Sequence, residues 1–238
     1  ELDKVSSRIN KICSTAKKRN VPVFIDAEES WVQDIVDQWA YDMMLRYNKE
    51  KCIVYNTVQM YRHDRILFLK ECLQKAKKSN VSYGVKLVRG AYMEKERGRA
   101  EEMGYPSPIQ IDKESTDRDY NFALDYILNN INYFSLVAGT HNEKSSQILA
   151  HSLAKYNITK DDLRIYFAQL LGMSDHISFN LADNDFNVAK YVPFGPVREV
   201  MPYLLRRADE NTSVAGQTGR ELGLIKTELK ERKSNPKT

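Results

Sequence analysis

Residues 21–29 read Val-Pro-Val-Phe-Ile-Asp-Ala-Glu-Glu, a short apolar run that ends directly in acidic residues. The run predicts a buried strand of a parallel sheet. An open doubly wound sheet that binds dinucleotides would carry a glycine-rich turn after its first strand, and residues 26–29 contain no glycine. The glycine-rich stretch from Gly216 to Gly223 comes late and follows no apolar run. This stretch therefore favours a barrel over an open sheet.

Five more apolar runs follow, separated by longer charged stretches. The six runs are Val21–Ile25, Cys52–Tyr55, Gly84–Val88, Ser135–Ala138, Leu163–Phe167 and Val188–Val192. Their starts lie about 20 to 50 residues apart, which is typical of βα units in a parallel sheet. Amphipathic helices are predicted at Trp31–Tyr47, Asp64–Lys78, Thr116–Ile131, Ser145–Tyr156 and Val197–Glu210. The alternation predicts an α/β protein of the (β/α)8 TIM-like barrel type, with about six of the eight βα units in this chain.

Length and composition exclude several other classes. A chain of 238 residues with 42% hydrophobic and 29% charged residues can bury a substantial core, so disorder is excluded. Its net charge of +4 is too small to predict a nucleic-acid partner. The cysteines (Cys13, Cys52 and Cys72) fit a reducing compartment and lack the spacing of a metal site. No HExxH motif or Walker loop is present, so neither a metal hydrolase nor a P-loop NTPase is predicted.

Polar side chains stand at the carboxyl end of every apolar run, where a barrel carries its chemistry. They are Asp26, Gln59, Lys86 with Arg89, Thr140 with His141 and Asn142, Gln169, and Tyr191. Polar residues are common wherever a strand leaves the core, so a purely structural explanation stays open for each single position. Their occurrence at all six ends favours a shared functional site.

Lys86 is the most informative of these residues because it lies inside an otherwise apolar strand. Alternation places Lys86 on one face and Leu87 and Arg89 on the other. An unpaired ammonium group in a core is very costly, so Lys86 must face an anion, a bound cofactor or the water-filled mouth of a barrel. Asp26 is its expected counter-charge. The alternative is that Asp26 caps the helix that follows it.

The last predicted helix carries a second group of polar residues. Tyr203, Arg206, Arg207 and Glu210 lie on one helical face because their spacing is 3, 4 and 7 residues. Two adjacent arginines beside a tyrosine can hold a small carboxylate through paired charged hydrogen bonds. An exposed Arg206–Glu210 ion pair of little energetic value is the alternative.

Motifs distributed from about Val21 to Glu221 carry a family resemblance. They are Phe24-Ile-Asp-Ala-Glu28, Val58-Gln-Met-Tyr61, Lys86-Leu-Val-Arg-Gly-Ala-Tyr92, Gly139-Thr-His-Asn142, Gln169-Leu-Leu-Gly-Met173, and Tyr191-Val-Pro-Phe-Gly-Pro196 followed by Tyr203-Leu-Leu-Arg-Arg-Ala-Asp-Glu-Asn211. Together, and in this order, they resemble the proline dehydrogenase family, and their local sequences are most similar to its monofunctional branch. This family consists of flavoenzymes that oxidise L-proline to 1-pyrroline-5-carboxylate.

The resemblance implies a distorted (β/α)8 barrel with FAD at its carboxyl-end mouth and assigns roles to individual residues. The implied catalytic residues are Asp26, Lys86 and Tyr191, and the implied substrate-binding residues are Tyr203, Arg206 and Arg207. The residues implied to bind or support FAD are Ala27, Gln59, Lys86, Arg89, Gly90, Ala91, Thr140, His141, Asn142, Gln169 and Glu210. No metal is expected.

The resemblance also implies partners and a place in the cell. We expect L-proline as substrate, a quinone as electron acceptor, peripheral membrane association and no nucleic acid. The location would be the bacterial cytoplasm or inner membrane face, or the matrix side of the mitochondrial inner membrane. Residues 1–225 are expected to form the barrel and residues 226–238 a basic tail.

Nothing before Asp26 matches the family's early substrate-binding lysine, so two strands and that lysine are expected upstream, in an N-terminal part of the barrel. A phosphate-binding barrel enzyme is disfavoured, because no glycine-rich loops follow the last two apolar runs. Two other functions remain open. One is oxidation of hydroxyproline, against which the ring-walling Tyr191 argues because it leaves little room for a ring hydroxyl. The other is a non-catalytic fragment of the barrel, favoured by the two expected missing strands.

Overall fold

The computed structural model describes the backbone of residues 2–213 and 217–234, and the side chains in these ranges apart from residues 206–221. The strands are β1 (Val23–Ile25), β2 (Val54–Gln59), β3 (Tyr83–Val88), β4 (Phe134–Gly139), β5 (Ile165–Leu170) and β6 (Val188–Tyr191). The helices are α1 (Leu2–Arg19), α2 (Ser30–Tyr47), α3 (Arg65–Ser79), α4 (Met93–Met103), α5 (Lys113–Asn129), α6 (Glu143–Lys155), α7 (Asp175–Asp183), α8 (Val197–Ser213) and α9 (Gln217–Ser234). Each predicted apolar run overlaps a strand, so the predicted alternation is confirmed.

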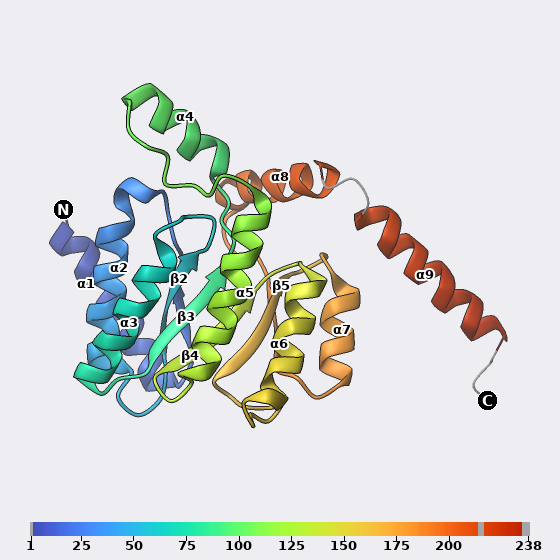
Figure 1. Ribbon diagram of the computed structural model, residues 1–238, viewed down its shortest axis with the longest axis horizontal. Helices are drawn as coiled ribbons and strands as arrows, with labels where there is room; N and C mark the ends of the chain where they lie inside the picture. The colour runs from blue at the N-terminus through green and yellow to red at the C-terminus, as the bar shows by residue number, and fades with distance from the viewer. Residues whose placement is uncertain (1, 214–216, 235–238) are drawn as a thin grey trace.

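The six strands form one parallel sheet in the order β1-β2-β3-β4-β5-β6. Each strand pairs with the next along the chain, so all carboxyl ends lie at the same edge of the sheet. In Figure 1 the strand arrows point toward the end of the molecule where α4 and α8 lie. This arrangement is a half-barrel, which confirms the predicted barrel class with six βα units.

The two faces of the sheet carry different side chains. The main core lies between the sheet and its helices, where Leu87 and Leu136 pack with helix residues such as Leu124. A smaller apolar cluster on the other face contains Tyr55 and Val137. Period-2 alternation within β4 explains why the neighbours Leu136 and Val137 belong to different clusters. Burying each large aliphatic side chain contributes about 1.5–3 kcal/mol, which makes the helix-covered face the source of most of the stability.

A buried asparagine ties the amino-terminal ends of the central strands together. The Oδ1 atom of Asn48 accepts hydrogen bonds from the backbone N–H groups of Ile53 and Val54, both at 2.9 Å. Its Nδ2 atom donates to the carbonyl oxygens of Val54 and Ser82 at 2.8 and 2.9 Å. The amide group thereby satisfies backbone groups that would otherwise be buried without partners. This end of the sheet is anchored, and the opposite end is left for polar side chains.

Several local details differ from the sequence predictions. β2 begins at Val54 and extends to Gln59, and β5 begins at Ile165 and extends to Leu170, so these two strands lie further along the chain than their predicted runs. The helices α4 and α7 were not predicted, because α4 has mostly charged residues without apolar periodicity and α7 has only 9 residues.

The C-terminal end of the described chain is helical. The expected boundary between residues 225 and 226 falls inside α9, which extends away from the sheet in Figure 1. Within residues 2–213 and 217–234, no helix has the length and apolar character needed to cross a membrane.

Candidate functional site at the carboxyl ends of the strands

Lys86 and Asp26 meet at the carboxyl ends of β3 and β1. The Nζ atom of Lys86 lies 2.5 Å from Oδ1 of Asp26, and the Thr57 hydroxyl donates to the same oxygen at 3.3 Å. Strand register places Lys86 beside Thr57 on one side and Val137 on the other, on the face that carries the smaller apolar cluster. The expected counter-charge is therefore confirmed. The alternative that Asp26 caps α2 is wrong, because the cap position is Glu29, three residues later.

This ion pair lies at the surface of the inner face of the half-barrel, the face with the smaller apolar cluster, which we call the concave face. The Lys86 side chain is 19% exposed and the Asp26 side chain is 59% exposed. An ion pair with that exposure contributes about 0–1 kcal/mol to stability. Its charges are therefore available to a ligand that covers the strand ends.

Gln59 holds the loop that follows β1. Its Nε2 atom donates to the carbonyl oxygen of Glu28 at 2.9 Å. The backbone N–H of Glu28 in turn donates to Oε1 of Gln33 on α2 at 2.8 Å. The predicted residue Ala27 belongs to this loop and is partly buried. The backbone of Glu28 in this loop is thus held from both the sheet and the helix.

The chain leaves β3 through Gly90, whose φ angle is +131°. A Cβ atom at this position would lie 2.5 Å from the ring of Tyr61. Both the left-handed conformation and the close approach therefore require glycine. Ala91 follows at the surface.

The ends of β4 and β5 are joined by buried polar groups. The Nε2 atom of Gln169 donates to the carbonyl oxygen of Thr140 at 3.2 Å, and its Oε1 atom accepts from the Ser178 hydroxyl at 2.9 Å. His141 Nδ1 lies 3.0 Å from the hydroxyl oxygen of Ser174. Asn142 is the N-cap of α6, where its Oδ1 atom accepts from a backbone N–H group. Thr140 and Gln169 are both buried.

Two tyrosines meet where β6 leads into α8. The ring centroids of Tyr191 and Tyr203 are 5.5 Å apart with an interplanar angle of 57°. Tyr191 is 44% exposed, so the pair borders solvent. The predicted residues Arg206, Arg207 and Glu210 continue along α8, and their side chains lie outside the described residues. The predicted carboxylate clamp and its ion-pair alternative are therefore untested.

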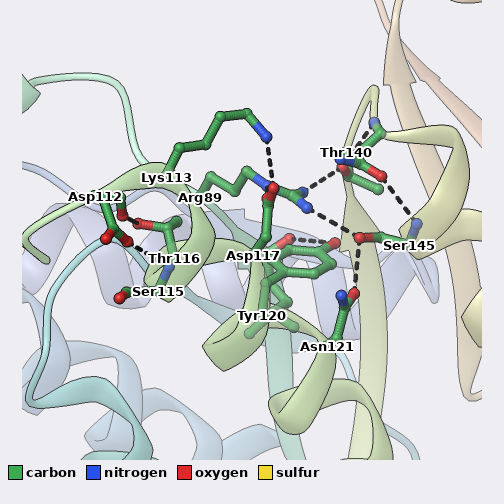
Figure 2. A network of polar contacts seen from close by, with 12 residues as sticks. Arg89, Asp112, Lys113, Ser115, Thr116, Asp117, Tyr120, Asn121, Thr140 and Ser145 are labelled. Atoms are coloured by element: carbon green, nitrogen blue, oxygen red, sulfur yellow. Dashed lines mark hydrogen bonds and ion pairs between the residues drawn. The ribbon is translucent and has the colours of Figure 1, made fainter.

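Arg89 lies at the centre of a polar network that sequence reasoning missed (Figure 2). Its guanidinium group contacts Asp117 of α5, Thr140 after β4 and Ser145 of α6. The missed residues carry a sequence signal, because Asp117, Tyr120 and Asn121 are spaced 3 and 4 residues apart and share one face of a helix. This spacing indicates that the three residues share a helix face, but it does not indicate that the face contacts Arg89.

Helix α4 is attached to the start of α2. The buried carboxylate of Glu96 accepts hydrogen bonds from both the backbone N–H and the hydroxyl of Ser30 at 2.6 Å. The Arg99 guanidinium lies 4.4 Å from the centre of the Trp31 ring. A surface hollow of about 530 Å³ lies beside α4, and none of the predicted site residues lines it.

Cysteine and metal chemistry find no support in the described part of the chain. Burial raises the pKa of the Cys13 and Cys52 thiols to about 11 and that of Cys72 to about 12. Neutral thiols are poor nucleophiles. Within the described ranges, no group of three or more His, Cys, Asp or Glu residues could hold a metal ion.

The fold and the site together define a class, that of parallel (β/α) barrel proteins with polar residues converging at the carboxyl ends of the strands. The sequence profile described as Proline dehydrogenase matches residues 2–220. The chain therefore belongs to the proline dehydrogenase family.

Individual relatives support this assignment. The chain is 40% identical to proline dehydrogenase 1, mitochondrial, of Arabidopsis thaliana, covering 98% of this chain and 48% of the relative. It is 38% identical to hydroxyproline dehydrogenase of Xenopus laevis, covering 96% of this chain and 50% of that protein. The crystal structure of proline utilization A from Bdellovibrio bacteriovorus matches with a TM-score of 0.83 and 26% identity, covering 90% of this chain and 22% of that one. The chain thus spans about half the length of these two curated relatives.

Proposed function

We propose that this chain carries the catalytic half-barrel of an FAD-dependent oxidoreductase that oxidises L-proline to 1-pyrroline-5-carboxylate, the first step of proline catabolism. The observation that carries the proposal is Lys86, a cation on the concave face at the end of a central strand, beside Asp26. Membership of the proline dehydrogenase family supplies the substrate class.

The donor groups at this edge fit a flavin cofactor. A cation (Lys86), a buried hydroxyl (Thr140) and buried amides (Gln59 and Gln169) follow four neighbouring strands. Such groups suit the carbonyl and phosphate oxygens of FAD. We assign its binding to Ala27, Gln59, Lys86, Arg89, Gly90, Ala91, Thr140, His141, Asn142 and Gln169, with Glu210 supporting α8. Bound FAD would supply the acceptor for the hydride that leaves the substrate.

Lys86 and Asp26 have separate tasks in this proposal. The ammonium of Lys86 stabilises negative charge that develops beside it, because a cation already fixed in position favours such charge. The Asp26 carboxylate orients the substrate amine, which must lose its proton before the C–H bond breaks. Tyr191, whose ring lies tilted against that of Tyr203, borders the proline ring in this proposal and holds the reacting carbon in place.

Arg206 and Arg207 bind the substrate carboxylate in this proposal, which rests on their spacing beside Tyr203 on α8. Arg206→Met is expected to raise KM for proline about tenfold or more, a loss of about 1.4 kcal/mol. Arg198→Met on the same helix is the matched control and leaves KM unchanged. An unchanged KM in the Arg206 variant would contradict the clamp.

Anaerobic spectroscopy tests the proposed reaction. The purified protein is expected to be yellow, or to become so with added FAD, and L-proline is expected to bleach the visible flavin bands. A protein that stays colourless with added FAD would instead support the alternative of a non-catalytic fragment that needs a further part of the barrel.

Hydroxyproline is a second candidate substrate, because the Xenopus laevis relative at 38% identity is a hydroxyproline dehydrogenase. We favour L-proline, because the role proposed for Tyr191 places its ring against the proline ring, where a ring hydroxyl would be crowded. The ratio of kcat/KM for the two substrates decides between them, and a ratio in favour of hydroxyproline would overturn the preference.

The electron acceptor and location follow from the same proposal. We propose that a quinone takes the electrons, through peripheral association with a membrane. The mitochondrial names of several relatives favour the matrix side of the inner mitochondrial membrane over a bacterial membrane face. Faster reoxidation by a soluble quinone than by oxygen would support this; the reverse order would contradict it.

A further inference from the structure

The Arg89 network joins four elements at the carboxyl edge of the sheet. Arg89 leaves the end of β3, and its Nε atom donates to Oδ1 of Asp117 on α5 at 2.6 Å. One terminal nitrogen donates to Oγ1 of Thr140 after β4 at 2.7 Å. The other donates to the Ser145 hydroxyl oxygen on α6 at 2.9 Å. Figure 2 shows the guanidinium group between these three oxygens.

The directions of the hydrogen bonds in this network are fixed by chemistry. Arginine has only donors, so Thr140 and Ser145 must both accept from Arg89. Thr140 Oγ1 also accepts from the backbone N–H of Asn142 at 3.0 Å. Both of its acceptor positions are then filled. The Ser145 hydroxyl in turn donates a hydrogen bond to Oδ1 of Asn121 at 2.7 Å. One orientation of each hydroxyl is thereby selected.

An aromatic ring and an acid hold the guanidinium group in place. Its central carbon lies 4.3 Å from the centre of the Tyr120 ring, which is fully buried. Burial works to raise the pKa of Asp117, and hydrogen bonds from Lys113 and Arg89 outweigh it, so this pKa lies below its ordinary value. Asp117 is therefore ionised at neutral pH and supplies the charge that Arg89 needs.

We propose that Asp117 and Ser145 are positioning residues, which act through Arg89 to set the Thr140 hydroxyl and the Gly90 backbone where a cofactor contacts them. All three guanidinium nitrogens of Arg89 already donate to protein oxygens, so its main task is to hold this edge together. The part concerning the cofactor rests on the proposed function. Asp117 and Ser145 themselves touch no reacting atom.

The test compares four variants of the purified protein. Asp117→Asn removes the charge at nearly constant shape, and Ser145→Ala removes one acceptor of Arg89. Lys113→Ala removes the other partner of Asp117 and leaves Arg89 paired. Asp125→Asn breaks the exposed ion pair with Lys155 further along α5. The last two variants are the matched controls.

Two measurements are made well below the melting temperature of each variant. Titration of FAD into apoprotein, followed by quenching of flavin fluorescence, is expected to give a Kd about tenfold higher for Asp117→Asn and Ser145→Ala. The Kd of the controls stays within about twofold of wild type, and KM for proline at saturating FAD is unchanged in all four. Amide hydrogen exchange in residues 140–146 is expected to be faster in the two test variants alone.

The outcomes separate a positioning role from a merely stabilising one. A lower melting temperature with an unchanged Kd and unchanged exchange at residues 140–146 overturns the proposal. Equal effects in Lys113→Ala and Asp125→Asn overturn it as well. If wild-type protein binds no flavin, the proposed function fails, and hydrogen exchange still decides whether Asp117 and Ser145 position this edge.

Discussion

The central and the outer strands of the half-barrel end in different ways. At β3 and β4, Arg89, Asp117 and Thr140 are partly or fully buried and each has defined hydrogen-bond partners. At β1 and β6, Asp26 and Tyr191 are exposed. Buried polar groups must be satisfied within the protein, whereas exposed ones can exchange water for a ligand. The centre of the edge is therefore a prebuilt support, and under the proposed function the outer ends are the surfaces that a substrate would contact.

The largest expected effect concerns Lys86, which lies on the central strand β3 and pairs with Asp26 at the end of the outer strand β1. Lys86→Met is expected to slow anaerobic flavin reduction by proline about hundredfold, because a fixed cation beside developing charge is removed. The free energy of unfolding changes by about 1 kcal/mol or less, since the Asp26 carboxylate of the pair is 59% exposed and can be solvated without Lys86. Stopped-flow absorbance and urea unfolding measure the two quantities.

Lys155→Met is the matched control, because it breaks another exposed lysine–aspartate pair far from the strand ends. An equal loss of rate in both variants would show that Lys86 has no special place in the reaction.

A large effect on stability is expected at the centre of the edge. Arg89→Met removes three hydrogen bonds and leaves Asp117 with only the exposed Lys113. The free energy of unfolding should fall by about 2 kcal/mol, because polar groups that lose a partner keep their desolvation cost. Urea unfolding measures the change.

Arg118→Met on α5, the helix that also carries Asp117, serves as the comparison for Arg89. Its ion pair with Asp119 is exposed on the arginine side, so the loss should stay below about 0.5 kcal/mol. Equal losses of unfolding free energy in the Arg89 and Arg118 variants would contradict the proposed stabilising role of the buried network.

A glycine pair tests whether the exit from β3 is strained. Gly90→Ala is expected to lower the free energy of unfolding by about 1–2 kcal/mol, because its φ of +131° and the nearby Tyr61 ring both oppose a Cβ atom. Gly98→Ala in α4 meets no atom within 4 Å and should be neutral or stabilising by up to about 1 kcal/mol. Thermal unfolding of both variants checks the sign, and a destabilised Gly98 variant would contradict it.

The smallest expected effect is a dependence on pH. The pKa of Asp117 is lowered in the folded protein, because bonds from Lys113 and Arg89 outweigh burial. Its contribution to stability is therefore present above the ordinary carboxyl pKa of about 4 and is lost as pH falls through the lower folded value. The difference in unfolding free energy between wild type and Asp117→Asn should shrink below about pH 4. A difference that stays constant down to pH 2.5 would show that Asp117 is not the titrating group.

Local sequence pattern predicted the strands better than the helices. The apolar runs stand out because parallel strands are buried on both faces, and all six correspond to strands. Helix α4 escaped prediction because its Met-Glu-Lys-Glu-Arg-Gly-Arg sequence has no apolar periodicity. Its attachment to the molecule through Glu96 and Ser30 joins residues 66 positions apart, which no local pattern reports.

The candidate site was predicted in part. Asp26 and Lys86 were paired correctly from sequence because the carboxyl ends of parallel strands converge however far apart they lie in the chain. The Arg89–Asp117 pair was missed because Asp117 lies on a helix with several charged residues. The sequence does not indicate which of them faces the protein and which faces solvent. The roles of Arg206 and Arg207 stay predictions.

The sequence by itself determined the class of fold, the family and the residues that stand at the strand ends. These follow from period-2 burial, βα spacing and motif order, which are properties of short segments. Only the tertiary structure decided which of those residues are directed to the protein and which to solvent. Arg89 and Lys86 are both cations at the end of β3, yet one is held by α5 and α6 and the other lies on the concave face. Their side chains leave opposite faces of the same strand, and the elements packed against each face decide what each cation contacts.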